Sequence, residues 1–323
     1  MAPIVVIGGS QGGVEAVLEI ASGLPAEFPA AVLVVLHVGA GPSTLPSILN
    51  GVGLLPASHG KSGDRIEAGH IYVAPADHHL IVADGHLKLS KGPRENWTRP
   101  AIDPLFRTAA AALGPDCIGV ILTGGLNDGT AGLYRIKQCG GVAVVQDPKD
   151  ADAPSMPRSA LENVDIDFCV PVAEIAPLLV RLVKDVRKRE RGKVGVPAME
   201  HSDQETARPV AQTCPECGGA MREENVGTLT QFRCHIGHVM TAEVLVAAQL
   251  EDLEQHLGSV LRLLNERADL CRELAEKQMA RGNTAARDFW MRASREAKER
   301  ETAIRAMTEA EWIRPETVEQ AAE

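Results

Sequence analysis

The chain has 323 residues, of which 45% are hydrophobic and 24% are charged. This balance is typical of a globular protein and excludes a fully disordered, collagen-like or membrane-embedded chain. The length exceeds the ~100–200 residues of one typical domain, so we expect two domains, or one domain with appendages. A net charge of −10 argues against nucleic acid as a partner, because nucleic-acid-binding domains usually carry a basic surface.

No run of about 18 apolar residues is present, so we expect no membrane insertion. The first residues, 1–10, lack the basic region of a signal peptide. These two features predict a cytoplasmic protein. In a reducing compartment, the seven cysteines are expected to be free thiols or metal ligands rather than disulfides.

Residues 1–191 alternate strand-like and helix-like segments and are expected to form the main domain. We predict strands at 4–7, 32–36, 71–74, 118–122 and 142–145, helices at 14–22, 45–49, 102–113, 130–138 and 172–191, and a hairpin over 80–89. Several of these strands are continuous apolar runs, as is typical of parallel strands that are buried on both faces. The order predicts an α/β fold with a doubly wound, mostly parallel, Rossmann-like sheet.

The remaining residues predict a small cysteine-rich unit and a helical hairpin. Residues 192–212 contain Gly, Pro, Ser, Gln and Thr with little periodicity and are expected to be a linker, followed by the cysteine-rich unit over 213–241. A helical pattern starts at residue 242, is broken at Gly282-Asn283 and resumes, which predicts an αα-hairpin over 242–310 and a tail over 311–323. The hairpin could dimerise, fold back over the main domain or dock a signalling partner.

Three polar side chains follow three different predicted strands. Ser10 lies in the glycine-rich turn after the first strand, His37 ends the second, and Asp128 follows the strand at 118–122. Sites in open parallel sheets form at the carboxyl ends of the strands. A sharp strand-to-helix turn can expose a serine nucleophile, and the backbone N–H groups of Gln11 and Gly12 would then stabilise an oxyanion.

Each of these residues also has a simpler interpretation. Ser10 could cap the following helix, and Asp128 could be an ordinary turn residue. The turn also lies one residue away from the dinucleotide pattern Gly-x-Gly-x-x-Gly, but Ser10 replaces the middle glycine and His37 stands where an acidic residue is needed. Together, however, Ser10, His37 and Asp128 supply a nucleophile, a base and an orienting carboxylate, which require no cofactor.

The first 190 residues resemble the catalytic domain of the CheB family of chemotaxis protein-glutamate methylesterases. The resemblance rests on collinear segments, namely Val5–Gly13, Leu36-His37, Gly69–Pro75, Arg99–Phe106, Leu122–Gly124, Asp128-Gly129, Gln146–Pro148 and Ser155–Pro157. It implies that Ser10 is the nucleophile, His37 the base and Asp128 the orienting carboxylate. It also implies hydrolysis of glutamyl γ-methyl esters, and possibly deamidation of glutamine, on the cytoplasmic helices of a methylated chemoreceptor.

Two features depart from this family. Residues 123–126, shortly before Asp128, have the sequence Thr-Gly-Gly-Leu, whereas the family usually has Thr-Gly-Met-Gly there. The chain also starts at the first strand, without the family's receiver domain, so we expect no regulation by phosphorylation in cis. Arg99 belongs to a basic stretch that could bind an acidic receptor surface, or could be an ordinary solvated loop.

Two other functions remain open from the sequence. One is a catalytically idle esterase-fold adaptor that docks a chemosensory or two-component signalling partner through the C-terminal extension. The other is a general hydrolase of small esters on the same fold.

The cysteine-rich unit carries a potential metal site. Cys214, Cys217, Cys234 and His238 have the spacing of a structural zinc centre. A unit of about 30 residues cannot bury a sufficient core, so the metal would supply its folding free energy. Four protein ligands would leave no open position, which predicts a structural rather than a catalytic role. His235 is a rival for the fourth ligand.

Overall fold

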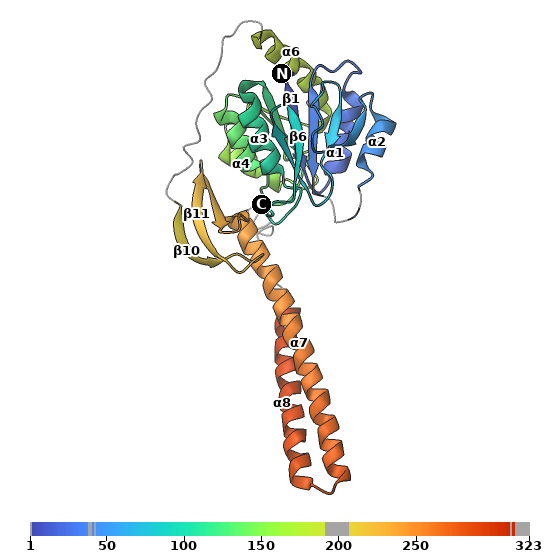
Figure 1. The fold of residues 1–323 in the computed structure, drawn as a ribbon, viewed down its shortest axis with the longest axis vertical. Helices are drawn as coiled ribbons and strands as arrows, with labels where there is room; N and C mark the ends of the chain where they lie inside the picture. The colour runs from blue at the N-terminus through green and yellow to red at the C-terminus, as the bar shows by residue number, and fades with distance from the viewer. Residues whose placement is uncertain (1, 38–40, 42, 191–206, 311, 314–323) are drawn as a thin grey trace. The chain divides into compact units, whose positions relative to one another are not determined.

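The computed structural model describes residues 2–37, 41, 43–190, 207–310 and 312–313 (Figure 1). It divides into two compact units, the first ending at Leu245 and the second beginning at Val246. The first unit contains the α/β domain and the cysteine-rich segment, and the second contains the helical hairpin.

The first unit is built on a seven-stranded sheet. Its strands are β1 (Ile4–Gly9), β2 (Ala31–Leu36), β3 (Ala57–His59), β4 (Ile71–Val73), β7 (Cys117–Ile121), β8 (Val142–Gln146) and β9 (Phe168–Val170). They lie in the order β3-β4-β2-β1-β7-β8-β9, and every neighbouring pair is parallel. The predicted doubly wound α/β fold is therefore confirmed. Strands β2, β3 and β4 lie on one side of β1 and strands β7, β8 and β9 on the other, which places the topological switch at β1.

Both faces of this sheet are covered by helices, as parallel sheets require. In β1, Val5 and Ile7 enter one hydrophobic core, whereas Ile4 and Val6 enter the other. The first core receives α1 (Gly13–Gly23), α2 (Leu45–Val52) and α6 (Val172–Glu190), and the second receives α3 (Ile102–Leu113), α4 (Thr130–Gln138), α5 (Ser155–Asn163) and the hairpin β5–β6 (His79–Ala83 and His86–Ser90). Figure 1 shows α1 and α2 on the opposite side of the sheet from α3 and α4.

The predicted helices at 102–113 and 130–138 and the hairpin around Asp84-Gly85 agree with the observed elements. The unpredicted elements of the α/β domain include the short strands β3 and β9 and the helix α5. A three-residue strand has no measurable periodicity. These strands form because they pair with β4 and β8, which local sequence does not reveal.

The cysteine-rich segment forms a four-stranded antiparallel sheet. Its strands are β10 (Arg208–Thr213), β11 (Ala220–Val226), β12 (Leu229–Cys234) and β13 (Val239–Thr241), paired in that order. β10 occupies the last residues of the segment that we expected to be a linker, 192–212. It pairs there with β11, where Arg208 lies opposite Glu223 and the two side chains form an exposed ion pair at 2.8 Å. Residues 192–206 of the expected linker lie outside the described residues.

The second unit is a hairpin of two long helices. α7 (Ala242–Ala280) begins in the first unit, and α8 (Thr284–Glu309) returns beside it (Figure 1). Asn283 caps α8 by accepting a hydrogen bond from the Ala286 N–H at 3.1 Å. Small side chains are buried in the hairpin, namely Ala268, Cys271, Ala275 and Ala297, which lets the two helices approach closely.

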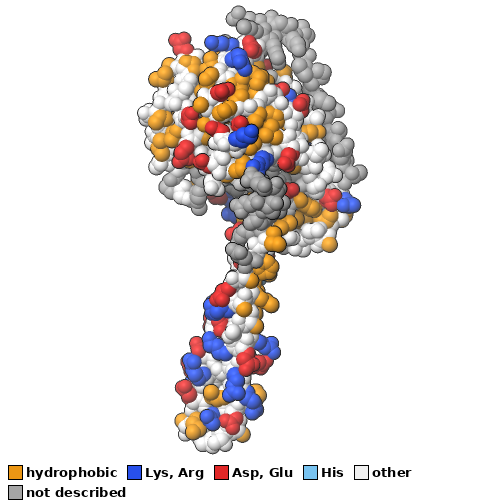
Figure 2. Space-filling model, turned by 180° about the vertical axis from the view of Figure 1, so that it is seen from behind, with side chains coloured by type: hydrophobic (Ala, Val, Ile, Leu, Met, Phe, Trp, Pro, Cys, Tyr) orange, Lys and Arg blue, Asp and Glu red, His pale blue; other side chains and the backbone are white. Residues whose placement is uncertain are grey.

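The surface of the hairpin is strongly charged. Figure 2 shows Lys and Arg side chains intermixed with Asp and Glu along the two helices. None of the helices in the described part of the chain is both long and apolar enough to span a membrane. The expected tail, 311–323, lies outside the described residues except for Trp312 and Ile313.

Candidate active site

The three candidate residues lie at the carboxyl ends of adjacent strands. β1 leads to Ser10, β2 on one side leads to His37, and β7 on the other side leads to the loop that contains Asp128. The His37 N–H donates to the Gly9 carbonyl at 3.2 Å, and the Ser10 N–H donates to the Thr123 carbonyl at 2.9 Å. The topological switch therefore places Ser10 between the other two residues.

His37 and Asp128 form a direct contact. His37 Nε2 lies 2.7 Å from Asp128 Oδ2, and the carboxylate is 3% exposed. With Nε2 used in this way, Nδ1 is the ring nitrogen that is left for a nucleophile. Within the described residues the Ser10 hydroxyl makes no hydrogen bond. In enzymes without substrate, the contact between nucleophile and base is often long and closes only in the substrate complex.

Asp128 is surrounded by hydrogen-bond donors. Its oxygens accept from the backbone N–H groups of Ile102 at 2.7 Å and Asp103 at 3.3 Å, at the start of α3, and from Asn96 Nδ2 at 2.8 Å. Burial by itself raises the pKa of this carboxyl group. Hydrogen bonding and charge from His37, together with the Ile102 N–H and Asn96, outweigh burial and lower the pKa. The carboxylate is thus held in its ionised form.

A second carboxyl group, that of Asp103, lies beside this network. It is 1% exposed and accepts hydrogen bonds from Asn96 Nδ2 at 2.8 Å and from the Gly132 N–H at 2.6 Å. Burial, and next the negative charge of Asp128, raise the pKa of Asp103 well above its usual value. Asn96 therefore bridges two carboxyl groups whose pKa values are shifted in opposite directions.

The turn that carries Ser10 is held by its neighbours. Thr123 Oγ1 donates to the Gln11 carbonyl at 2.9 Å and accepts from the Ala153 N–H at 2.8 Å. A Cβ atom at Gly124 would lie 2.8 Å from Ser10 Cβ and would collide with the Met156 sulfur. The N-cap of α1 is Gly12, with φ of +73°, and not Ser10. The Ser10 hydroxyl is therefore not used for capping.

The structure also locates the remaining predicted residues. The backbone N–H groups of Gln11 and Gly12, just before α1, donate to no other group within the described residues. Arg99 donates through Nε and Nη2 to Asp77, at 2.9 and 2.6 Å, and through Nη1 to the Gly92 carbonyl at 2.8 Å. Arg99 therefore braces the loop around it, and its role towards a substrate stays a prediction.

Three residues around the site were not assigned roles from the sequence. Asn96 has φ of +50° in an irregular loop and carries no motif that would mark it. Asp103 belongs to the segment that resembles the family, but its closeness to Asp128 depends on how α3 packs. Gln146 accepts from the Thr123 N–H at 2.9 Å and so holds the residue whose carbonyl binds the Ser10 N–H.

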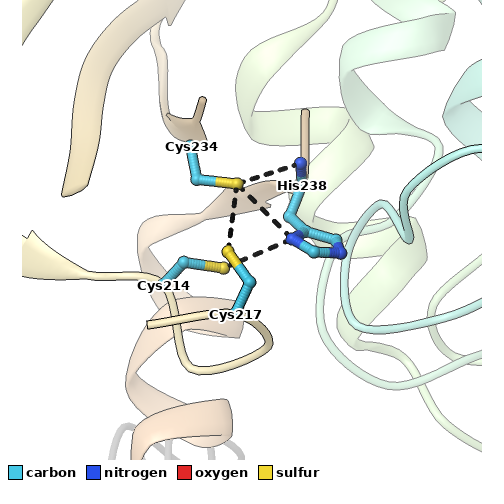
Figure 3. A group of neighbouring side chains, drawn as sticks. All are labelled: Cys214, Cys217, Cys234 and His238. Atoms are coloured by element: carbon cyan, nitrogen blue, oxygen red, sulfur yellow. Dashed lines mark hydrogen bonds between the residues drawn. The ribbon is translucent and has the colours of Figure 1, made fainter. Parts of the chain in front are cut away.

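The four predicted metal ligands gather on the small sheet. The ligand atoms of Cys214, Cys217, Cys234 and His238 all lie within 4.8 Å of one another. Figure 3 shows the three thiols and the His238 ring directed toward a common centre. His235 is exposed and is not among them, and its ring lies against Gly219 instead.

The distances within this cluster fit tetrahedral zinc. With zinc–sulfur and zinc–nitrogen bonds of the usual length, the edges of a tetrahedron are about 3.7 Å between two sulfurs and about 3.5 Å between sulfur and nitrogen. Cys217 Sγ and Cys234 Sγ lie 3.7 Å apart. His238 Nδ1 lies 3.6 Å from Cys214 Sγ and 3.4 Å from Cys234 Sγ. The donor set and its spacing therefore match a closed, structural site.

Comparison with known proteins agrees with this fold. The family model described as CheB methylesterase matches residues 5–179, more than half of the chain. The chain belongs to the CheB methylesterase family. The match covers the α/β domain, whereas the Cys/His cluster and the helical hairpin lie outside it.

The relatives of this CheB domain span bacteria and archaea. A putative protein-glutamate methylesterase/protein-glutamine glutaminase of Leptospira interrogans is 40% identical over 180 residues, which are 55% of this chain and 93% of that protein. A methylesterase/glutaminase of Pyrococcus abyssi is 34% identical over 57% of this chain, and the match covers 51% of that relative. The crystal structure of the Thermotoga maritima CheB methylesterase catalytic domain aligns with a TM-score of 0.55 and 33% identity, covering 56% of this chain and 99% of that one.

Proposed function

We propose that this protein is a cytoplasmic protein-glutamate methylesterase that hydrolyses glutamyl γ-methyl esters on methylated chemoreceptors. The observation that carries the proposal is the 2.7 Å contact of His37 with the buried Asp128, beside the turn that delivers Ser10. The names of the relatives, protein-glutamate methylesterase/protein-glutamine glutaminase, support the substrate class.

The first step is attack on the ester. Ser10 Oγ forms a bond to the ester carbonyl carbon while His37 Nδ1 takes the hydroxyl proton. Asp128 fixes the imidazole tautomer through Nε2 and stabilises the positive charge that develops on the ring. The N–H groups of Gln11 and Gly12 donate to the oxyanion. When the carbon–oxygen bond to the methoxy group breaks, His37 returns the proton and methanol leaves.

The second step releases the product. His37 removes a proton from water as the water oxygen attacks the acyl carbon. The bond from that carbon to Ser10 Oγ then breaks, and His37 returns the proton to Ser10 Oγ, which leaves a glutamate side chain and the free serine. Deamidation of glutamine follows the same steps with ammonia as the leaving group. The established chemistry of a serine, a histidine and an aspartate therefore accounts for both activities in the relatives' names.

The proposal is tested by methanol release from a methylated receptor fragment with the full-length protein. We expect Ser10→Ala to lower the rate by at least about 10³-fold, since removing a triad nucleophile leaves only binding and oxyanion stabilisation. Ser22→Ala, on the exposed side of α1, is the control and is expected to keep the rate. Methanol release by Ser10→Ala at the wild-type rate would overturn the proposal.

We further propose that Cys214, Cys217, Cys234 and His238 hold one structural zinc ion. The ion would stabilise the small sheet β10–β13 and would take no part in ester hydrolysis, because four protein ligands leave no position for a substrate.

Metal analysis of the purified full-length protein tests this second proposal. We expect about one zinc per chain in the wild type and a large loss of zinc in Cys214→Ala, since structural zinc binding needs the complete ligand set. Cys169→Ser changes an exposed thiol on β9 and should retain the metal. The proposal is wrong if wild-type protein and Cys214→Ala have the same zinc content.

A further inference from the structure

The sheet β10–β13, which carries the four candidate metal ligands and is called the Cys/His sheet below, contacts residues 94–96. The side chain of Asn96 in this loop binds Asp128. The Asn96 N–H donates to the Val239 carbonyl at 2.7 Å, and the Val239 N–H donates to the Arg94 carbonyl at 3.4 Å. Glu95 and Val239 form a parallel bridge. Val239 is the first residue of β13 and directly follows His238, so the strand that pairs with this loop begins next to a metal ligand.

The same strand fixes two buried amide side chains. The Thr241 N–H donates to Asn96 Oδ1 at 3.3 Å, and Thr241 Oγ1 donates to Asn127 Oδ1 at 2.7 Å. Asn127 Nδ2 in turn donates to Glu243 at 2.8 Å. Asn96, Asn127 and Thr241 are at most 6% exposed. These contacts are therefore shielded from water, where losing a hydrogen bond costs most.

The contacts determine which way the Asn96 amide faces. Because its oxygen accepts from Thr241, its nitrogen faces the carboxyl groups of Asp103 and Asp128, to which it donates. Asn127 precedes Asp128 in the chain, so holding its side chain also restrains the backbone of Asp128. β13 thus holds Asp128 from two directions, through a hydrogen bond and through the chain.

We propose that the Cys/His sheet completes the esterase site, with Thr241, Asn96 and Asn127 as positioning residues for Asp128, so that metal binding by the sheet and ester hydrolysis are coupled. The coupling rests on the proposed function. A metal that binds only the folded sheet favours the state in which β13 is in place, and whatever favours that state also favours metal binding.

The first test uses Thr241 variants of the zinc-loaded full-length protein. Thr241→Val removes the hydroxyl that binds Asn127. We expect kcat for methanol release to fall about tenfold, the factor that one lost buried hydrogen bond gives, with KM and zinc content unchanged. Thr241→Ser keeps the hydroxyl and should therefore keep kcat near the wild-type value. Thr230→Val makes the same change at another threonine of the sheet, whose hydroxyl donates to Asn225 at 3.2 Å in an exposed position, and should keep the wild-type kcat.

The second measurement separates this proposal from the substrate assignment. The rate at which a fluorophosphonate modifies Ser10 reports activation of the serine without any methyl ester. We expect this rate to fall in Thr241→Val and in chelated wild-type protein, and to recover in the latter when zinc is returned. If methanol is never released but labelling follows this pattern, the substrate is wrong and the coupling stands.

Two results would overturn the coupling. One is wild-type kcat and labelling in zinc-loaded Thr241→Val. The other is zinc-free protein that labels and turns over at the rate of the loaded protein.

Discussion

The two buried carboxyl groups that Asn96 bridges, those of Asp103 and Asp128, differ in protonation because their hydrogen-bond donors differ. Asp128 accepts from His37, from two backbone N–H groups at the start of α3 and from Asn96, so its ionised form is stabilised. Asp103 has fewer donors and faces the charge of Asp128, which favours its protonated form. Groups with pKa values pushed apart in this way are typical of catalytic sites.

Asp103 predicts a pH dependence of stability. Its pKa is raised in the folded state. Its favourable contribution to the free energy of unfolding is therefore complete below the pKa of the unfolded chain, about 4, and is lost as the pH rises through the folded pKa. Asp103→Asn has no such titration. We therefore expect the melting temperature of wild type minus that of Asp103→Asn to fall as the pH rises above about 4.

Thermal unfolding across a pH series measures this difference. Asp84→Asn, at the exposed turn between β5 and β6, is the control for loss of a surface carboxyl group. A difference between wild type and Asp103→Asn that does not change with pH would contradict the assignment.

At the level of elements, the turn after β1 depends on a close approach of the loop after β7. Gly124 lies where any Cβ would meet Ser10 Cβ at 2.8 Å and collide with Met156 of α5. Among the described residues, none lies within 4 Å of the Cβ position of the neighbouring Gly125. Two adjacent glycines of one loop therefore have different roles, and only the first is required by packing against the serine turn.

This contrast gives a matched pair of variants. We expect Gly124→Ala to lower methanol release by up to about 10²-fold, because a shift of about 1 Å in a reacting group can cost this much. Gly125→Ala adds the same methyl group into open space and should keep most of the activity. Equal rates for the two variants would show that the close approach at Gly124 does not position Ser10.

At the level of the whole molecule, the esterase domain and the Cys/His sheet belong to one compact unit. Backbone pairing of β13 with the loop of Asn96 joins them. The helical hairpin forms the second unit, with its own seam of small residues and the hydrogen bond from Ser294 Oγ to the Ala268 carbonyl at 2.8 Å.

The sequence by itself determined the central strands, the candidate active site and the Cys/His cluster of this protein. Apolar runs predicted the central strands, since buried parallel strands need hydrophobic side chains on both faces. The position of Ser10, His37 and Asp128 after three strands predicted the candidate site, because strand ends of a parallel sheet share an edge. Cysteine and histidine spacing predicted the ligand cluster, since that geometry is nearly local.

Only the tertiary structure decided the contacts between distant segments. The pairing of β3 with β4, the pairing of β9 with β8 and the bridge that Asn96 forms between Asp103 and Asp128 all depend on residues that lie far apart in the chain or in irregular loops. So does the contact of Thr241 with Asn127, 114 residues away. Such contacts leave no periodic pattern, because their partners are brought together by the packing of whole elements and not by neighbouring residues.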